Sequence, residues 1–119
     1  IYIVNWYGKT KSFYNICKNI FLGGSMVSHG GQNPLEATRY GCNILHGPNI
    51  SNFNEIYKFL KMNKISTKVT NQKSILKELR KLLFRDKRTT KIQRKLELIG
   101  KNILLKTYKE ISLIYKNEI

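Results

Sequence analysis

The sequence predicts an α/β fold in which a parallel sheet is flanked by helices and the chain ends in long helices. Three observations indicate this: short apolar runs without polar alternation, helical patterns between those runs, and a glycine-rich turn directly after one of them. Strands of a parallel sheet show such unbroken runs because helices cover both faces. The expected order is β-α-β-α-β-α-β with right-handed crossovers.

The first 70 residues are expected to form this α/β core. The strands are expected at Ile1–Val4, Ile20–Leu22, Asn43–His46 and Ile65–Val69. Helical patterns lie between the strands, at Lys11–Asn19, from Pro34 onward, and at Asn54–Met62. His46, at the end of a strand, is expected to be structural.

Residues 71–119 are expected to form the helical end of the same domain. Apolar residues at helical spacing mark one helix that ends before Asp86 and a longer one that runs to the end of the chain. The marking residues are Ile75, Leu79, Leu82 and Leu83, then Ile92, Leu96, Ile99, Ile103, Ile111 and Ile114. Gly100 is expected to bend or interrupt the longer helix.

The charge of the chain is strongly positive and unevenly distributed. Its 119 residues hold 22 Lys and Arg against 7 Asp and Glu, a net charge of +15 that favours an anionic partner. Residues 1–56 carry only four basic and two acidic residues, so the second half holds nearly all the excess. An alternative source of the Lys, Asn and Ile content is A/T-rich codon usage. The charge alone therefore permits an anionic partner without identifying one.

Several kinds of site are not expected. Cys17 and Cys42 lie far apart and outside a Cys-x-x-Cys pattern, so we expect two buried free thiols and no metal site. No segment approaches the roughly 18 apolar residues of a membrane span. The chain begins at Ile1 without an initiator Met, and we expect it to be a piece of a longer protein.

Residues that bring backbone close to a ligand are concentrated between Leu22 and Pro48. Gly23-Gly24-Ser25 directly follows an expected strand, and Gly30-Gly31 leads into an expected helix. In an open α/β sheet, a loop at the carboxyl end of a strand is where ligands bind. A nucleotide is the natural candidate, although GxGxxG and GxxxxGK[ST] are both absent. The alternative is that these glycines only make tight turns.

The start of the helix at Pro34 carries a capping pattern. Asn33 suits the N-cap, Pro34 fits the first turn, and Glu36 stands where it completes a capping box. Free amides at a helix start suit an anionic phosphate. Glu36 has the alternative role of only capping its helix.

The stretch GGSMVSHGGQNPLEATRYGCNILHGPNISNFNEIY, from Gly23 to Tyr57, resembles a known family. It is similar to the carboxy-terminal domain of the 3-deoxy-D-manno-octulosonic acid (Kdo) transferases of lipid A assembly, whose pattern runs GGS, HGGHNPLE, GP and NF-x-E. The resemblance implies that residues 1–119 are part of the Rossmann-like, nucleotide-sugar-binding carboxy-terminal domain of a GT-B glycosyltransferase.

The resemblance also assigns residues to the donor site. The CMP moiety is expected on two stretches, Tyr7-Gly8-Lys9 and Asn33-Pro34-Leu35-Glu36. Glu36 would take the ribose hydroxyls, and Asn33 with the first-turn amides would face the phosphate. The donor sugar or phosphate is expected on a loop made of Gly24, Ser25, His29, Gly30 and Gly31.

Within that loop, Ser25 or His29 would donate to the Kdo carboxylate or phosphate. Three positions depart from the family pattern: Lys9 replaces a Glu, Gln32 replaces a His, and Asn49 replaces a His. Trp6 and Tyr7 would either stack on the cytosine or cover the sheet edge.

The resemblance implies a reaction and its partners. Kdo would pass from CMP-Kdo to a lipid A precursor at the cytoplasmic face of the bacterial inner membrane, without a metal or cofactor. The proton-abstracting carboxylate and the acceptor site would belong to an amino-terminal domain, so the 119 residues alone are expected to be inactive. The basic second half would meet anionic lipid head groups.

Two other functions stay open at this stage. A GT-B enzyme of the same fold could use another sugar nucleotide, such as a UDP-sugar. A basic nucleic-acid-binding module is the third reading, although the chain lacks an RRM aromatic signature and a recognition helix, and no nucleic acid is expected as a partner.

Overall fold

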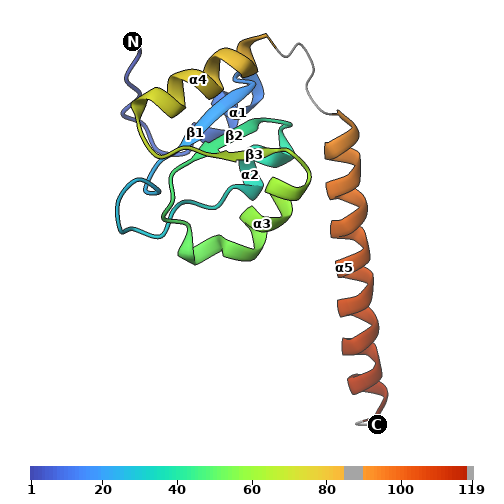
Figure 1. Ribbon diagram of the computed structural model, residues 1–119. Coiled ribbons are helices and arrows are strands. Elements are labelled where there is room, and N and C mark those ends of the chain that lie inside the picture. Colours follow the sequence, from blue (N-terminus) through green and yellow to red (C-terminus); the bar gives the residue numbers. More distant parts are fainter. Residues whose placement is uncertain (85–89, 118–119) are drawn as a thin grey trace. The chain divides into compact units, whose positions relative to one another are not determined.

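The computed structural model describes residues 1–84 and 90–117 (Figure 1). The chain divides into two compact units, Ile1–Thr89 and Thr90–Ile119. The first is an α/β unit, and the described residues of the second form one helix.

Three strands form a sheet among the described residues of the first unit. They are β1 (Asn19–Leu22), β2 (Asn43–His46) and β3 (Ser66–Lys68), in the order β1-β2-β3. Both pairings are parallel, and at their carboxyl ends Leu22 stands opposite His46, which stands opposite Lys68. The prediction of a parallel α/β sheet is confirmed for these three strands.

The first expected strand, Ile1–Val4, is wrong. These residues have no regular structure, and Ile1, Tyr2 and Ile3 are more than four-fifths exposed. A strand needs a neighbouring strand for its amide and carbonyl groups. Among the described residues, nothing pairs with Ile1–Val4, so an apolar run alone did not make a strand.

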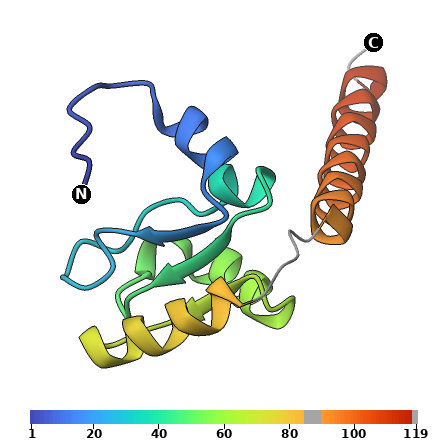
Figure 2. The same ribbon diagram turned by 90° about the horizontal axis from the view of Figure 1, so that it is seen from above.

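Helices cover both faces of this sheet. They are α1 (Thr10–Ile16), α2 (Leu35–Arg39), α3 (Asn54–Met62), which follows the short 3₁₀ helix η1 (Ser51–Phe53), and α4 (Gln72–Leu83). Figures 1 and 2 show α4 on one face and α2 and α3 on the other. The expected helix at Asn54–Met62 has the predicted bounds, and the one expected at Lys11–Asn19 is shorter.

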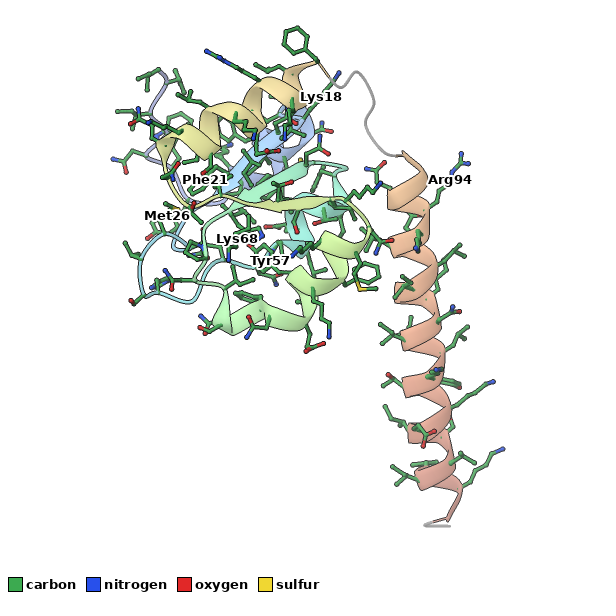
Figure 3. All side chains as sticks on the ribbon, in the orientation of Figure 1. Lys18, Phe21, Met26, Tyr57, Lys68 and Arg94 are labelled. Atoms are coloured by element: carbon green, nitrogen blue, oxygen red, sulfur yellow. The ribbon has the colours of Figure 1, made fainter. Side chains whose placement is uncertain are left out.

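The two faces have separate apolar contacts. On one face Leu45 and Val69 are buried with Leu82 of α4, and Ile75 and Leu79 pack against them. On the other face the ring of His46 lies 4.3 Å from that of Tyr57 in α3, and Tyr57 is labelled in Figure 3. Helix α4 is therefore part of the compact unit that holds the sheet. Its start is fixed by a capping box, in which Asn71 and Ser74 exchange hydrogen bonds.

The two cysteines differ in exposure. Cys42 is buried, and its thiol donates to the carbonyl oxygens of Tyr14 and Cys17. Cys17 follows α1 and is exposed, so the expectation of a buried thiol is wrong for Cys17 and confirmed for Cys42.

The second unit is helix α5 (Thr90–Asn117). It runs through Gly100 without interruption, so the expected break at this residue is wrong. Between residues 93 and 116 its apolar side chains are largely exposed, among them Leu104 and Tyr108. In the described part of the chain, none of the helices combines the length and the apolar character that crossing a bilayer requires.

Candidate functional site

The candidate site lies where the three strands end. Because the strands are parallel and in register, Leu22, His46 and Lys68 reach the same edge of the sheet. The two loops that carry the motif leave from this edge: residues 23–34 follow β1, and residues 47–53 follow β2. Ligands bind at this edge in open α/β sheets.

Ser25 joins the two loops at their base. Its hydroxyl donates to the carbonyl oxygen of Leu22 (2.7 Å) and accepts the amide of Gly47 (2.8 Å). The backbone repeats the link, because the amide of Asn49 donates to the carbonyl oxygen of Ser25 (2.8 Å). The serine is fully buried. Its hydroxyl hydrogen is already used, so the expectation that Ser25 donates to a ligand is corrected: the residue holds the loops together.

Gly47 makes this junction possible. A Cβ at residue 47 would collide with the carbonyl group of Ser25 and would lie 2.8 Å from the amide nitrogen of Met26. These are backbone atoms, which cannot turn away as the end of a flexible side chain can. The second loop thus passes directly against the first.

His29 and Gly30 stand at the far end of the glycine loop. His29 is exposed, and its ring lies against Gly24, where a Cβ would be 2.9 Å from the ring carbon Cδ2. The amide of Gly31 donates to the carbonyl oxygen of Gly24 (3.1 Å), which closes the loop on itself. The expected loop residues Gly24, His29, Gly30 and Gly31 are therefore brought together by the fold.

Asn52 of η1 contacts the same loop through two hydrogen bonds. Its side-chain amide donates to the carbonyl oxygen of His29 (3.2 Å), and its backbone amide donates to that of Gly30 (3.2 Å). Sequence reasoning assigned no role to Asn52, although it is the Asn of the NF-x-E pattern.

Asn33 lies one residue before the N-cap of α2, where we expected it to be the N-cap itself. Its Oδ1 accepts the amide of Leu35 (3.0 Å), and the first i to i+4 backbone bond of α2 runs from Thr38 to Pro34 (3.0 Å). The helical bounds place Pro34 at the N-cap, and no reciprocal bond from Glu36 is present among the described residues, so the expected capping box is wrong. The Glu36 carboxylate is half-buried and is left for another partner.

The charge of Glu36 affects the pKa of a tyrosine in a neighbouring helix. Burial raises the pKa of Tyr14 in α1, and the negative charge of Glu36 raises that pKa further. The rings of Tyr14 and Tyr40 are 6.2 Å apart, which ties α1 to the end of α2. The carboxylate of Glu36 therefore lies near enough to α1 to act on Tyr14 through its charge.

His46 and Tyr57 are buried residues that hydrogen-bond to the two loops of the site. The Nδ1 of His46 is 2.7 Å from the carbonyl oxygen of Gly47, and burial lowers the pKa of the ring, with further lowering by the charges of Lys68 and Lys61. The Tyr57 hydroxyl donates to the carbonyl oxygen of Gln32 (3.1 Å), and burial raises its pKa to about 12. A structural role for His46 agrees with its burial.

The other expected CMP stretch, Tyr7-Gly8-Lys9, is placed differently. Tyr7 is fully exposed and Trp6 is three-quarters exposed, so neither covers the sheet edge. Lys9 precedes α1, where its carbonyl oxygen accepts the amide of Ser12 (3.1 Å). Among the described residues, no hydrogen bond joins Tyr7-Gly8-Lys9 to Asn33-Pro34-Leu35-Glu36.

The described residues offer no ready metal site. Among them, no group of three or more His, Cys, Asp or Glu side chains is close enough to hold an ion. The chemistry of the loops is that of amide and side-chain hydrogen bonds.

Similar proteins were found among curated sequences. The chain is 30% identical over 83 residues to a 3-deoxy-D-manno-octulosonic acid transferase of Aquifex aeolicus, which covers 70% of the chain and 24% of that protein. It is 34% identical over 83 residues to the protein of the same name from Rickettsia typhi, covering 70% of the chain and 18% of the relative. With the one from Haemophilus influenzae it shares 40% identity over 53 residues, 44% of the chain and 12% of the relative.

The chain thus matches between about an eighth and a quarter of the length of these relatives. A scan against models of protein families gave no match.

Proposed function

Because the chain belongs to the family of 3-deoxy-D-manno-octulosonic acid transferases, we propose that it forms part of the donor site of a Kdo glycosyltransferase. The observation that supports this most is the junction of the two loops at the carboxyl edge of the sheet, where Ser25 and Asn52 hold the glycine loop to the loop after β2. The proposed donor is CMP-Kdo, and the proposed architecture of the whole enzyme is GT-B.

The nucleotide would lie at the start of α2. Asn33 uses its Oδ1 for the amide of Leu35, which leaves its Nδ2 to donate to phosphate. The amide of Leu35 is taken by Asn33, and the remaining first-turn amides of α2, which have no acceptor within the helix, would face the phosphate. The half-buried carboxylate of Glu36 would accept the ribose hydroxyls.

The donor sugar would lie against the glycine loop. The space beside Gly24 and Gly30 is taken by the side chains of His29 and Asn52, and the exposed ring of His29 would donate to the sugar's carboxylate or to the phosphate. As the bond to CMP breaks, negative charge grows on the departing phosphate. Donors fixed beforehand stabilise that charge and lower the barrier.

The remaining parts of the reaction would belong to other regions of the full-length enzyme. We propose a lipid A precursor as acceptor, a catalytic carboxylate outside these 119 residues, and the cytoplasmic face of the bacterial inner membrane as the place of reaction. The proposal includes no metal or cofactor. The basic second half of the chain would be drawn to anionic head groups, at about 1 kcal/mol for each Lys or Arg near the surface.

Titration of the full-length protein with CMP tests the nucleotide site. Asn33→Ala and Glu36→Ala should each weaken CMP binding by about tenfold or more, because a hydrogen bond to a charged group contributes roughly 1.5–3 kcal/mol. Asn102→Ala and Glu97→Ala, which remove the same groups from exposed positions on α5, serve as matched controls and should leave the affinity unchanged.

Two results would contradict the proposed nucleotide site. Wild-type affinity in both Asn33→Ala and Glu36→Ala would remove the nucleotide from the start of α2. Competition by UDP at least as strong as by CMP would assign the site to a different sugar nucleotide.

A further inference from the structure

We infer that Asn52 is a positioning residue, which holds the His29–Gly31 segment in the conformation that receives the donor sugar. It rests on the proposed function only for the identity of that ligand. Asn52 lies in η1, on the loop after β2, and is separated from His29 by 23 positions in the sequence. The contact between Asn52 and His29 is therefore long-range, and local sequence preference does not provide it.

Two hydrogen bonds from one residue carry the inference. The side-chain Nδ2 donates to the carbonyl oxygen of His29 (3.2 Å), and the backbone amide donates to the next carbonyl oxygen, that of Gly30 (3.2 Å). Two successive peptide groups are thus fixed by a single donor residue. Fixing both leaves the segment little freedom to rotate about Gly30.

Asn52 and Gly30 pack directly against each other. Gly30 has φ +89°, and a Cβ built on it would collide with the side-chain amide of Asn52, with Cγ at 2.6 Å. The Asn side chain occupies the space that any larger residue at 30 would need. Gly30 itself is buried, although Asn52 is exposed.

The exposure of Asn52 separates positioning from stability. Hydrogen bonds of an exposed side chain compete with water and add little to global stability, whereas Ser25 and Gly47 hold the base of the loops. A loop that is already ordered loses less conformational entropy when a ligand binds. Asn52 therefore affects binding of the sugar by holding His29 and Gly30 in place. The ring of His29 in turn lies against Gly24.

The first test needs no ligand. In the full-length protein, Asn52→Asp keeps the shape of the side chain and removes its donor, and Asn52→Ala removes both. Both variants should speed hydrogen exchange at the amide of Gly31, which is bonded to Gly24, by about fivefold or more, while the urea midpoint of unfolding stays unchanged. The matched control is Asn54→Ala, an exposed Asn two positions away.

The second test compares two ligands. Both Asn52 variants should raise the Kd for CMP-Kdo by about fivefold while the Kd for CMP alone stays as in the wild type, because Asn33 and Glu36 are untouched. A merely structural role would weaken both ligands together and lower the urea midpoint, and either result would overturn the inference. So would unchanged exchange at Gly31 in both variants.

The failure of the proposed function has its own signature. If the wild type binds neither CMP nor CMP-Kdo while the Asn52 variants still speed exchange at Gly31, the ligand assignment fails and the positioning of the loop by Asn52 stands.

Discussion

The loops that leave β1 and β2 and the first nine residues of the chain differ in what holds them in place. In the loops, buried Ser25 and Gly47 bring backbone against backbone, and side chains reach across 22 or more positions of sequence. In residues 1–9, the aromatic side chains Tyr2, Trp6 and Tyr7 are three-quarters or more exposed. A donor site needs hydrogen-bond donors that are already fixed in place. Within this chain, contacts fix the loops after β1 and β2, whereas the aromatic side chains of residues 1–9 are left exposed.

The largest effect should come from filling the junction of the loops. In Gly47→Ala the new methyl group meets the carbonyl of Ser25 and the amide of Met26, so backbone must move, and we expect a loss of about 3 kcal/mol in the free energy of unfolding. Urea unfolding followed by circular dichroism measures it.

Gly23→Ala is the matched control for that variant. It stands in the same loop, with nothing within 4 Å of its Cβ, and should change the free energy of unfolding by less than about 0.5 kcal/mol. Equal losses in the two variants would mean that the close contact at Gly47 is not what organises the loops.

A smaller effect should come from protonating His46. Its pKa in the folded protein lies below the ordinary 6.5, mainly because burial disfavours the charged ring. The hydrogen bond with the Gly47 carbonyl raises this pKa, and the charges of Lys68 and Lys61 lower it further. Stability from the neutral ring is therefore present above pH 6.5 and is lost as the pH falls through the folded-state pKa. The free energy of unfolding should be lower at pH 5 than at pH 7.5.

His46→Gln separates this residue from the other titrating groups. The variant has no imidazole to charge, so its stability should fall less between pH 7.5 and pH 5 than that of the wild type. Parallel losses in both proteins would assign the pH dependence to other groups.

The sequence located the elements whose residues are buried against neighbours in the same chain. The strand at Asn43–His46 and the helix at Asn54–Met62 have the predicted bounds, because apolar period and turn residues agree there. Ile1–Val4 has the same apolar character, yet it lacks a partner strand among the described residues. A pattern within one segment does not contain that information.

The site shows the same limit at the level of single groups. Gly24, His29, Gly30 and Gly31 come together as the motif indicated, whereas the residue type of Ser25 suggested an available donor. Only the fold reveals that Leu22 already takes its hydrogen. The contact of Asn52 with the loop could not be predicted from the sequence either, because it depends on how two loops pack against each other.

The smallest effect tests the exposed side of the comparison. Tyr7→Ala should change the free energy of unfolding by less than about 0.5 kcal/mol, because the ring of Tyr7 is fully exposed. Tyr57→Phe removes a hydroxyl that donates to Gln32, so it should lose about 1 kcal/mol although it deletes one atom and not a ring. Urea unfolding of both variants measures the contrast. A loss above 1 kcal/mol in Tyr7→Ala would mean that residues 1–9 pack against the protein in solution, and both regions would then be built by contacts within the chain.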